Sequence, residues 1–377
     1  MSVYLDNAAT TPVDPRVADL VLRLMSEEYG NAGSRTHEHG LAASRQVALA
    51  RERVSKLLGA GPDEIVFTSG ATESDNLAIL GLAAHGIASG RKHIVSTTIE
   101  HKAVLEPLRR LAGMGFDVDL VEPDSLGHVN AQDVLDRVRP DTLLVSVMHS
   151  NNETGAVQPI GAIAAGLPDA VLMHVDAAQT FGRLDVQLAD TRIDLISVSG
   201  HKIFAPKGVG ALVVRRRGGA RPPLEPLMLG GDQERGLRPG TQPVALIAGL
   251  GLAAEIAAQE REARAGACRR IRAEALAALA PLSPRVLGDE GRGVLPHILS
   301  LSVPGVDSEA VMVALKGLVA ISNGSACTSA RYEPSHVLTA MRLPEEEAAG
   351  VVRISWSHAT PPVPWSEMAA RLDDLRI

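Results

Sequence analysis

The feature that most constrains the fold of this chain is an alternation of short apolar runs with longer segments of helical periodicity. The apolar runs are rich in Val, Ile and Leu and are bounded by turn residues, which is typical of strands covered on both faces. We expect strands at 64–68, 93–96, 142–148, 171–175, 195–198 and 210–214. This alternation predicts an α/β fold with a largely parallel sheet.

Helices are expected between these strands and after them. Apolar residues recur at helical spacing over 46–58, and Gly59 follows as a stop signal. The other expected helices cover 72–84, 246–279 and 308–316, and a further apolar strand covers 298–303. The long Ala-rich helix would carry the chain from a large domain to a smaller C-terminal one.

Composition excludes several classes of protein. With 377 residues, 45% of them hydrophobic, the chain can bury an ample core. A net charge of −7 argues against a nucleic-acid-binding surface, which needs a basic face. The triplet Arg215–Arg217 is one candidate basic patch, and a solvated loop is its simpler interpretation. We therefore expect no direct contact with nucleic acid.

The cysteine count and the N-terminal sequence indicate a cellular compartment. Two cysteines do not make a disulfide framework, so a reducing compartment is expected. The N-terminus has no signal-peptide pattern, and no apolar stretch is long enough to cross a bilayer. The expected location is cytoplasmic, with no membrane contact.

Lys202 stands just past an expected strand, at the end of residues 197–202 (SVSGHK). Burial lowers the pKa of a lysine, so that its amine can attack an aldehyde and form a Schiff base. An ordinary loop lysine in a surface ion pair is the alternative. This motif alone does not choose between the two.

Asp176 ends the expected strand at 171–175, and Gln179 follows three residues later. Pyridoxal enzymes need a carboxylate that keeps the pyridine nitrogen protonated, which makes the ring an electron sink. Gln179 could reach the ring hydroxyl. A turn or capping aspartate is the common alternative, but a strand ending in Asp followed by a strand leading into Ser-x-His-Lys is much rarer than either part.

Two further motifs could complete a cofactor site. Residues 67–74 (FTSGATES) turn from a strand into a helix N-terminus, where N–H groups and the helix dipole favour a phosphate. The hydroxyls of Thr72 and Ser199 could add hydrogen bonds, although many helices simply begin this way. His101 could stack on a cofactor ring and move protons, because its ordinary pKa is near neutral. A structural role is the alternative for His101.

Cys327 lies within residues 322–330 (SNGSACTSA), which show no apolar periodicity. Such a loop can be exposed and mobile, as a sulfur-carrying thiol requires. Cys268 lies instead in an Ala/Arg-rich helix and is expected to be inert packing. Cys327 is therefore the candidate reactive thiol.

Arg353 lies inside an expected apolar strand, where a buried guanidinium needs an anion. A substrate carboxylate would satisfy it, with Asn152 assisting, and a structural Asp or Glu is the alternative. The segment His37–His39 lacks the His-Glu-x-x-His spacing, and Cys327 has no second thiol nearby. No metal site is expected.

In this order, these motifs resemble the cysteine desulfurases of the class V aminotransferase family. The resemblance runs from Tyr4 to Arg353 and is most specific at 70–74 (GATES), 199–202 (SGHK), 230–236 (GGDQERG) and 324–329 (GSACTS). It implies a fold-type I pyridoxal phosphate enzyme: a homodimer whose subunit has a large domain with a mainly parallel seven-stranded sheet and a small C-terminal α/β domain. We place the large domain at 14–258 and the small domain at 1–13 and 259–377.

The resemblance also implies a role for each residue. Lys202 is similar to the lysine that binds pyridoxal 5′-phosphate, while Asp176 and Gln179 are similar to the contacts of the ring nitrogen and ring oxygen. His101 resembles the stacking acid/base, and Cys327 resembles the persulfide-forming cysteine. The residues similar to the phosphate site are Ala71, Thr72, Ser199, His201 and, from the other subunit, Thr241. Those similar to the substrate-carboxylate site are Asn152 and Arg353.

The implied reaction converts L-cysteine to L-alanine. Lys202 would remove the Cα proton, and the thiolate of Cys327 would attack the substrate sulfur and keep it as a persulfide for a sulfur-acceptor protein. A selenocysteine lyase or an aminotransferase of the same family is the nearest alternative, and neither needs Cys327. A docking subunit without activity is disfavoured by the intact set of Lys202, Asp176, His101 and Cys327.

Two departures from the family concern the downstream partner. Residues 356–358 read Trp-Ser-His where many relatives have Leu-Gly-Arg, and the chain ends at Ile377 without the long tail that iron–sulfur-assembly relatives use. Segments 100–108 and 235–241 resemble the desulfurases that supply sulfur for DNA phosphorothioate modification. The acidic net charge fits an enzyme that hands sulfur to a protein. A housekeeping desulfurase for iron–sulfur clusters is the alternative.

Overall fold

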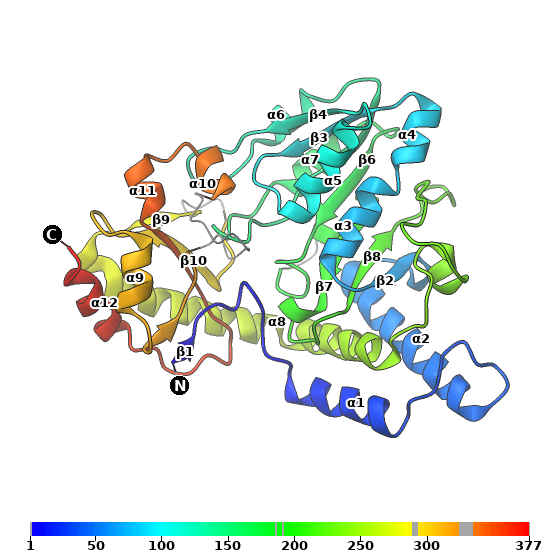
Figure 1. Ribbon diagram of the computed structural model, residues 1–377, viewed down its shortest axis with the longest axis horizontal. Coiled ribbons are helices and arrows are strands. Elements are labelled where there is room, and N and C mark those ends of the chain that lie inside the picture. The colour runs from blue at the N-terminus through cyan, green and yellow to red at the C-terminus, as the bar shows by residue number, and fades with distance from the viewer. Residues whose placement is uncertain (1, 185–186, 191, 289–292, 324–334, 377) are drawn as a thin grey trace.

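A seven-stranded sheet dominates the computed structural model, which describes all residues except 1, 185–186, 191, 289–292, 324–334 and 377 (Figure 1). The strand order is β2-β8-β7-β6-β5-β3-β4. These strands are β2 (Ile65–Thr68), β3 (His93–Thr97), β4 (Asp117–Val121), β5 (Thr142–Ser146), β6 (Leu172–Asp176), β7 (Leu195–Ser199) and β8 (Gly210–Val214). Only β8 runs antiparallel to its neighbours in this sheet; all other pairs are parallel.

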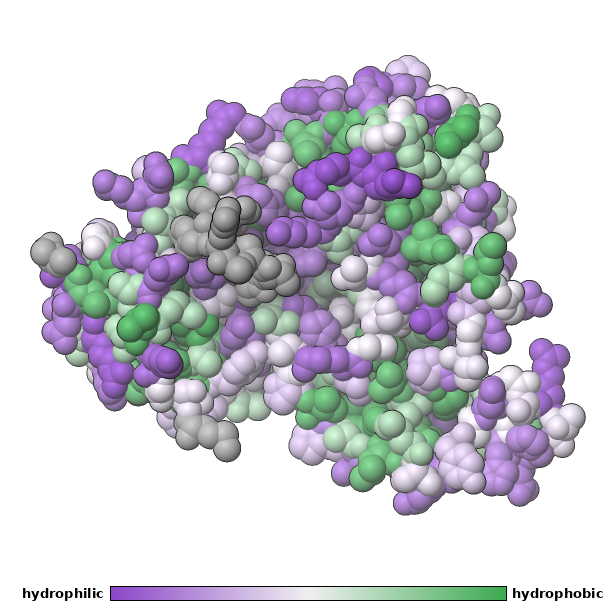
Figure 2. Space-filling model, viewed as in Figure 1, coloured by the Kyte–Doolittle hydropathy of each residue, from purple (hydrophilic) through white to green (hydrophobic). Residues whose placement is uncertain are grey.

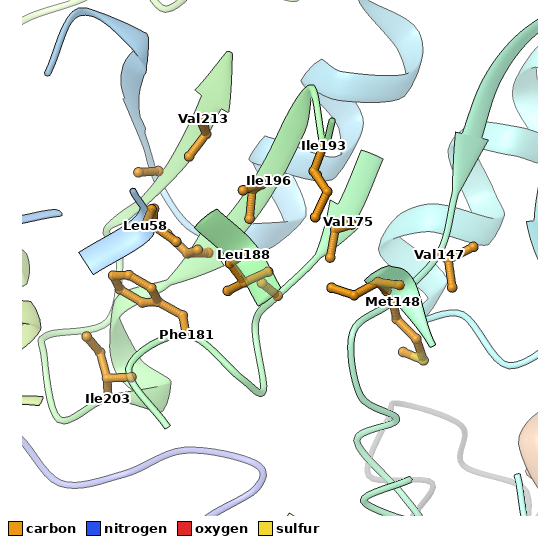
Figure 3. Close-up of a cluster of buried hydrophobic side chains, with 14 of the residues drawn as sticks. Leu58, Val147, Met148, Val175, Phe181, Leu188, Ile193, Ile196, Ile203 and Val213 are labelled. Carbon is orange, nitrogen blue, oxygen red and sulfur yellow. The ribbon is translucent and has the colours of Figure 1, made fainter. Parts of the chain in front are cut away.

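Both faces of this sheet are buried, because successive strand residues belong to different apolar clusters. On β2, Val66 packs with helices α3 (Ala71–Leu80) and α5 (Lys102–Ala112), whereas its neighbour Phe67 packs on the opposite face. That opposite face is covered by α2 (Glu38–Leu58), α7 (Ile160–Gly166) and the first half of α8 (Val244–Leu279). In Figure 3, Val175, Ile196 and Val213 from three adjacent strands gather in this second cluster.

A second apolar core lies in the C-terminal part of the chain. Its sheet has the order β12-β10-β9, formed by β12 (Val351–Ser355), β10 (Ile298–Ser302) and β9 (Arg285–Leu287), all antiparallel. The N-terminus joins it through β1 (Val3–Tyr4), which pairs in parallel with β11 (Val319–Ala320). Helices α9 (Ser308–Ala314) and α12 (Trp365–Asp373) pack on it. The predicted fold class is confirmed.

Helix α8 connects the two cores. Its first half contributes Ile247, Leu250 and Ala254 to the large core, and its second half contributes Cys268 and Leu279 to the C-terminal core. The remaining helices are α1 (Pro15–Ser26), α4 (Ala83–Ser89), α6 (Ala131–Leu135), α10 (His336–Ala340) and α11 (Glu345–Ala349). In the part of the chain that the structure describes, no helix combines the length and apolar character that crossing a membrane would need.

Two helices and one strand illustrate how the structure differs from the sequence prediction. The helix expected from residue 46 begins at Glu38, because His37 caps it by accepting a hydrogen bond from the N–H of Gly40 at 3.2 Å. The helix expected over 72–84 ends at Leu80, and the carbonyl of Gly81 instead accepts a hydrogen bond from the N–H of Glu225 at 2.8 Å. Strand β4 was not predicted because it lies at the sheet edge and is only partly buried.

Candidate active site

A cavity of about 630 Å³ lies at the carboxyl ends of the parallel strands. In an open α/β sheet this edge collects the loops that follow each strand, and ligands bind there. Ten of the residues that the sequence assigns to a site line this cavity: Ala71, Thr72, His101, Asn152, Asp176, Gln179, Ser199, His201, Lys202 and Arg353. These residues belong to both the large sheet and the C-terminal part of the chain. Their placement around one cavity is consistent with the prediction that they share one site.

Lys202 follows β7 and presents its amine to the N-terminal segment of the chain. Its Nζ donates hydrogen bonds to the carbonyls of Ala8 at 2.5 Å and Ala9 at 2.8 Å. Burial, followed by the charges of Arg353 and Arg183, lowers the pKa of Lys202 to about 7. An amine with this pKa is substantially unprotonated at neutral pH, which a nucleophile or a base requires.

Asp176 ends β6 at the floor of the cavity, with its Oδ1 accepting a hydrogen bond from the N–H of Ala178 at 2.9 Å. Burial, followed by the neighbouring carboxyl of Asp75, raises the pKa of Asp176 to about 6. Asp75, on α3, is fully buried and its own pKa rises to about 7 through burial. Burial therefore holds these carboxyl groups partly protonated.

The N-terminus of α3 forms one wall of the cavity. Gly70 precedes the helix with φ of 154°, which favours glycine, and Ala71 and Thr72 open the first turn. A Cβ on Gly210 would lie 2.6 Å from the Cα of Gly70, so only glycine lets β8 approach this turn. Ser199 ends β7 beside it. The arrangement offers backbone N–H groups and hydroxyls to an anion.

Three polar side chains border the remaining walls of the cavity. His101 caps α5 by accepting a hydrogen bond at Nδ1 from the N–H of Ala103 at 3.1 Å, which leaves the proton on Nε2 in the neutral ring. Burial lowers the pKa of His101. Gln179 donates to the carbonyl of Ala8 at 3.1 Å, and burial lowers the pKa of His201 to about 4. Both histidines are therefore neutral at physiological pH.

Arg353 reaches the cavity from β12 and is 2% exposed. Its guanidinium donates to Asp6 Oδ1 at 2.7 Å and to the carbonyl of Asn152 at 2.9 Å. The structural carboxylate that the sequence left open as an alternative is therefore present. The Nε of Arg353 is buried and has no hydrogen-bond partner among the described residues, so donor capacity remains.

Among the polar residues that line this cavity and that the sequence did not assign to the site are Glu153, Ser335 and His336. Ser335 donates a hydrogen bond to the buried carboxylate of Glu153 at 2.6 Å, and His336 donates to the carbonyl of Glu100 at 2.9 Å. These contacts tie the start of α10 to loops of the large sheet. The sequence signal was weak: Glu153 stands next to Asn152, and Glu100 stands next to His101, but nothing in the spacing shows what they contact.

Glu100 makes the stability of the apoprotein depend on pH. It is fully buried; its Oε1 accepts hydrogen bonds from Thr97 and Met148, and burial raises its pKa to about 8. The pKa of Glu100 in the folded protein exceeds its value of about 4.3 in the unfolded chain. The contribution of Glu100 to stability is therefore complete below about pH 4.3 and is lost as the pH rises through about 8. We expect apoprotein stability to fall from pH 6 to pH 9, by at most about 1.4 kcal/mol per pH unit for each such group.

Urea unfolding at both pH values checks this expectation. Glu100→Gln keeps a carbonyl acceptor and replaces the O–H with an amide, so it reproduces the protonated acid at every pH. The variant should lose less stability than the parent between pH 6 and pH 9. An equal loss in both proteins would show that Glu100 does not titrate in this range.

One expected site residue lies elsewhere in its own chain, and another falls outside the described residues. Thr241 is exposed and does not line the cavity of its own chain. It follows Arg238, whose Nε donates to Glu73 at 3.0 Å in the first turn of α3. Cys327 lies outside the described residues. Cys268 is buried, and burial raises the pKa of its thiol.

Pyridoxal 5′-phosphate fits the donors of this cavity. The helix N-terminus suits a phosphate dianion. A cation such as a protonated ring nitrogen would stabilise the buried carboxylate of Asp176. The Oε1 of Gln179 is buried and has no hydrogen-bond partner among the described residues. The amine of Lys202, with its lowered pKa, suits covalent attachment to an aldehyde.

Comparison with known proteins identifies the family of this chain. The family model "Aminotransferase class-V" matches residues 3–361. The protein named cysteine desulfurase IscS from Methylococcus capsulatus is 45% identical over 361 residues, which is 96% of this chain and 89% of that protein.

Solved structures are also similar to this chain. DndA from Streptomyces lividans is 52% identical with a TM-score of 0.81, covering 94% of this chain and 99% of that chain. SspA in complex with cysteine is 38% identical with a TM-score of 0.84, covering 96% and 99% respectively. The chain therefore belongs to the class-V aminotransferase family, and it is a pyridoxal 5′-phosphate-dependent cysteine desulfurase.

Proposed function

We propose that this enzyme takes sulfur from L-cysteine onto Cys327 and supplies it for DNA phosphorothioate modification. The proposed catalysis is supported by one observation above all. Lys202, Asp176 and Arg353 line the same cavity, although they lie on three separate elements. This combination provides an amine, an acid and a carboxylate-binding cation. The sulfur would then pass from Cys327 to an acceptor protein.

The cofactor, when bound, supplies an electron sink for negative charge at the substrate Cα. Lys202 would hold it covalently, Asp176 would bind its ring nitrogen, and Gln179 its ring oxygen. His101 would stack on the ring. The phosphate would be held by Ala71, Thr72, Ser199 and His201, with Thr241 reaching it from a second copy of the chain.

The charges around the cavity suit amino-acid binding and proton transfer. Arg353, with the help of Asn152, would hold the substrate carboxylate through donors that its contact with Asp6 leaves available. Lys202, with a pKa of about 7, would take the Cα proton and return it to the product. His101 is neutral and would donate through Nε2.

The sulfur step belongs to Cys327. Its thiolate would attack the sulfur of L-cysteine, so that an S–S bond forms while the bond between Cβ and sulfur breaks. The electron pair of the broken bond stays with the substrate carbon, which takes up a proton on the way to L-alanine. The sulfur remains on Cys327 as a persulfide, and no external oxidant is needed.

A homodimer is part of this proposal. Helix α1 and the turn after it expose Leu22, Met25 and Tyr29 at 67%, 64% and 72%, and Figure 2 shows an apolar patch over α1. Leu229 is 92% exposed on the segment that leads to Thr241. Apolar side chains exposed to this extent favour burial against another protein surface. We propose that a second copy covers these side chains and that Thr241 of each copy reaches the phosphate site of its partner.

The pathway is supported by sequence likeness. The chain is 52% identical to DndA and 45% identical to the IscS protein of Methylococcus capsulatus. Segments 100–108 and 235–241 resemble the desulfurases of DNA phosphorothioate modification. The IscS identity equally supports a housekeeping role in iron–sulfur cluster assembly, which is the second candidate function. A selenocysteine lyase or aminotransferase is the alternative without a role for Cys327.

Deletion of the gene separates the two pathways. We expect the deletion strain to lose phosphorothioate linkages in its DNA, measured by mass spectrometry of nuclease digests, while aconitase and other iron–sulfur enzymes keep their activity. Complementation with the intact gene should restore the linkages. Unchanged DNA sulfur with reduced iron–sulfur enzyme activity would favour the housekeeping role instead.

A further inference from the structure

A second, smaller cavity of about 40 Å³ lies behind the segment that carries Lys202. Its wall includes Ile203 and Phe204, the residues directly after Lys202, and Cys268 of α8. It also includes Ser357 and His358, which belong to the Trp-Ser-His segment that departs from the family pattern. The segment in which the sequence departs from the family pattern therefore lines a cavity that has no role in the proposed catalysis.

The lining of this cavity is basic. Its polar side chains are Arg183, Arg261, Arg264, Cys268, His297, Ser357 and His358, and no Asp or Glu lines it among the described residues. In a small cavity inside a protein, the low dielectric strengthens the attraction between an anion and a cationic side chain of the wall.

Arg183 is the key cation. One Nη donates to the carbonyl of Lys202 at 2.5 Å, and its Nε is buried without a hydrogen-bond partner. Within the described ranges, no ion pair joins Arg183 to a carboxylate. The nearby carboxylates Asp14 and Glu260 pair with Arg264, and both are shared with Arg16. Those acids therefore do not neutralise Arg183.

His297 supplies a neutral donor or acceptor at the same cavity. It is 2% exposed, and its Nε2 is buried without a hydrogen-bond partner in the described structure. Burial, followed by the charges of Arg183 and Lys202, lowers its pKa well below the ordinary value. Burial likewise lowers the pKa of His358 to about 4. Buried polar atoms without a hydrogen-bond partner are costly, so a ligand that pairs with them is favoured.

We propose that this cavity binds a single halide-sized anion between Arg183 and His297. Its volume exceeds the 10–15 Å³ or so that one water molecule needs, and it leaves little room for a hydrated or polyatomic anion. The bound anion offsets the charge of Arg183, which is one of the groups that lower the pKa of Lys202. The site therefore links halide binding to the electrostatics of the catalytic amine.

Crystals of the holoenzyme grown in sodium bromide test the site directly. Anomalous diffraction at the bromine edge should show a peak in this cavity, within hydrogen-bonding distance of the guanidinium of Arg183 and of His297 Nε2. A cavity that holds only water in these crystals overturns the proposal.

Thermal unfolding of the holoenzyme tests the site in solution. At constant ionic strength, replacing sodium gluconate by sodium bromide should raise Tm by about 2 °C in a saturable manner, because gluconate is too large for the cavity. Arg183→Met should remove this rise. The matched control Arg269→Met, an exposed arginine of α8 whose nearest carboxylate, Glu262, is 3.7 Å away, should keep it. A rise that survives Arg183→Met overturns the proposal.

Discussion

Replacing Lys202 with alanine should lower the turnover of L-cysteine by at least about 10³-fold, because the variant loses both the covalent anchor of the cofactor and the base at Cα. The amine of Lys202 combines a pKa of about 7 with a place at the end of β7, inside the cavity. Released alanine, measured against time with excess cofactor, gives the rate. The absorbance of the purified variant shows whether the cofactor is still attached.

Lys207 is the matched control for this experiment. It also borders the cavity, but it is exposed on the loop before β8 and makes no contact with Ala8 or Ala9. Lys207→Ala should keep most of the activity. Borohydride reduction of the parent enzyme, followed by peptide mapping, should place the cofactor on Lys202. A label on Lys207, or an active Lys202→Ala variant, would contradict the assignment.

The strands of the large sheet were predictable because they are buried on both faces. Each of β5, β7 and β8 is an unbroken run of apolar or small residues, all of them buried, and such runs are easily recognised in a sequence. β4 lies at the edge with one buried residue in five, and its sequence Asp-Val-Asp-Leu-Val does not stand out as a core strand. Burial on both faces, and not strand propensity alone, therefore made the prediction possible.

The basic triplet shows what a local pattern does not reveal. The sequence favoured a solvated loop for Arg215–Arg217, but Arg215 is 3% exposed and donates to the carbonyls of Gly59, Leu188 and Ile193. Arg217 pairs with Asp194 at 2.6 Å. A guanidinium can bridge several backbone carbonyls inside a protein, and those carbonyls come from distant segments that no local pattern shows.

The site residues were predictable to the extent that each follows a strand. Asp176 and Ser199 close β6 and β7, so the topology of a parallel sheet brings them to one edge. The contacts of Lys202 with Ala8 and Ala9, and that of Arg353 with Asp6, join segments more than 190 residues apart. Spacing within the sequence contains no information about such contacts, and only the folded chain reveals them.

Cys327→Ser should abolish persulfide formation while leaving cofactor binding intact, because a hydroxyl neither ionises near neutral pH nor accepts sulfur. Incubation with L-cysteine, followed by mass spectrometry of the intact protein, should show an added sulfur atom of about 32 Da on the parent and none on the variant. The cofactor absorbance of the two proteins should be the same, since no cofactor contact is assigned to Cys327. Alanine release should fall by at least about 10²-fold.

Cys268 is the internal control, because it is the other thiol of the chain. It is 5% exposed, and burial raises the pKa of its thiol, so little thiolate is present at neutral pH. Cys268→Ser should therefore leave both the persulfide and alanine release nearly unchanged. If Cys327→Ser stayed fully active, the thiol would have no part in carbon–sulfur cleavage, and a selenocysteine lyase or aminotransferase mechanism would explain the site better. If the persulfide instead appeared on Cys268, the second core would have to open during turnover, because the thiol of Cys268 lies buried within it.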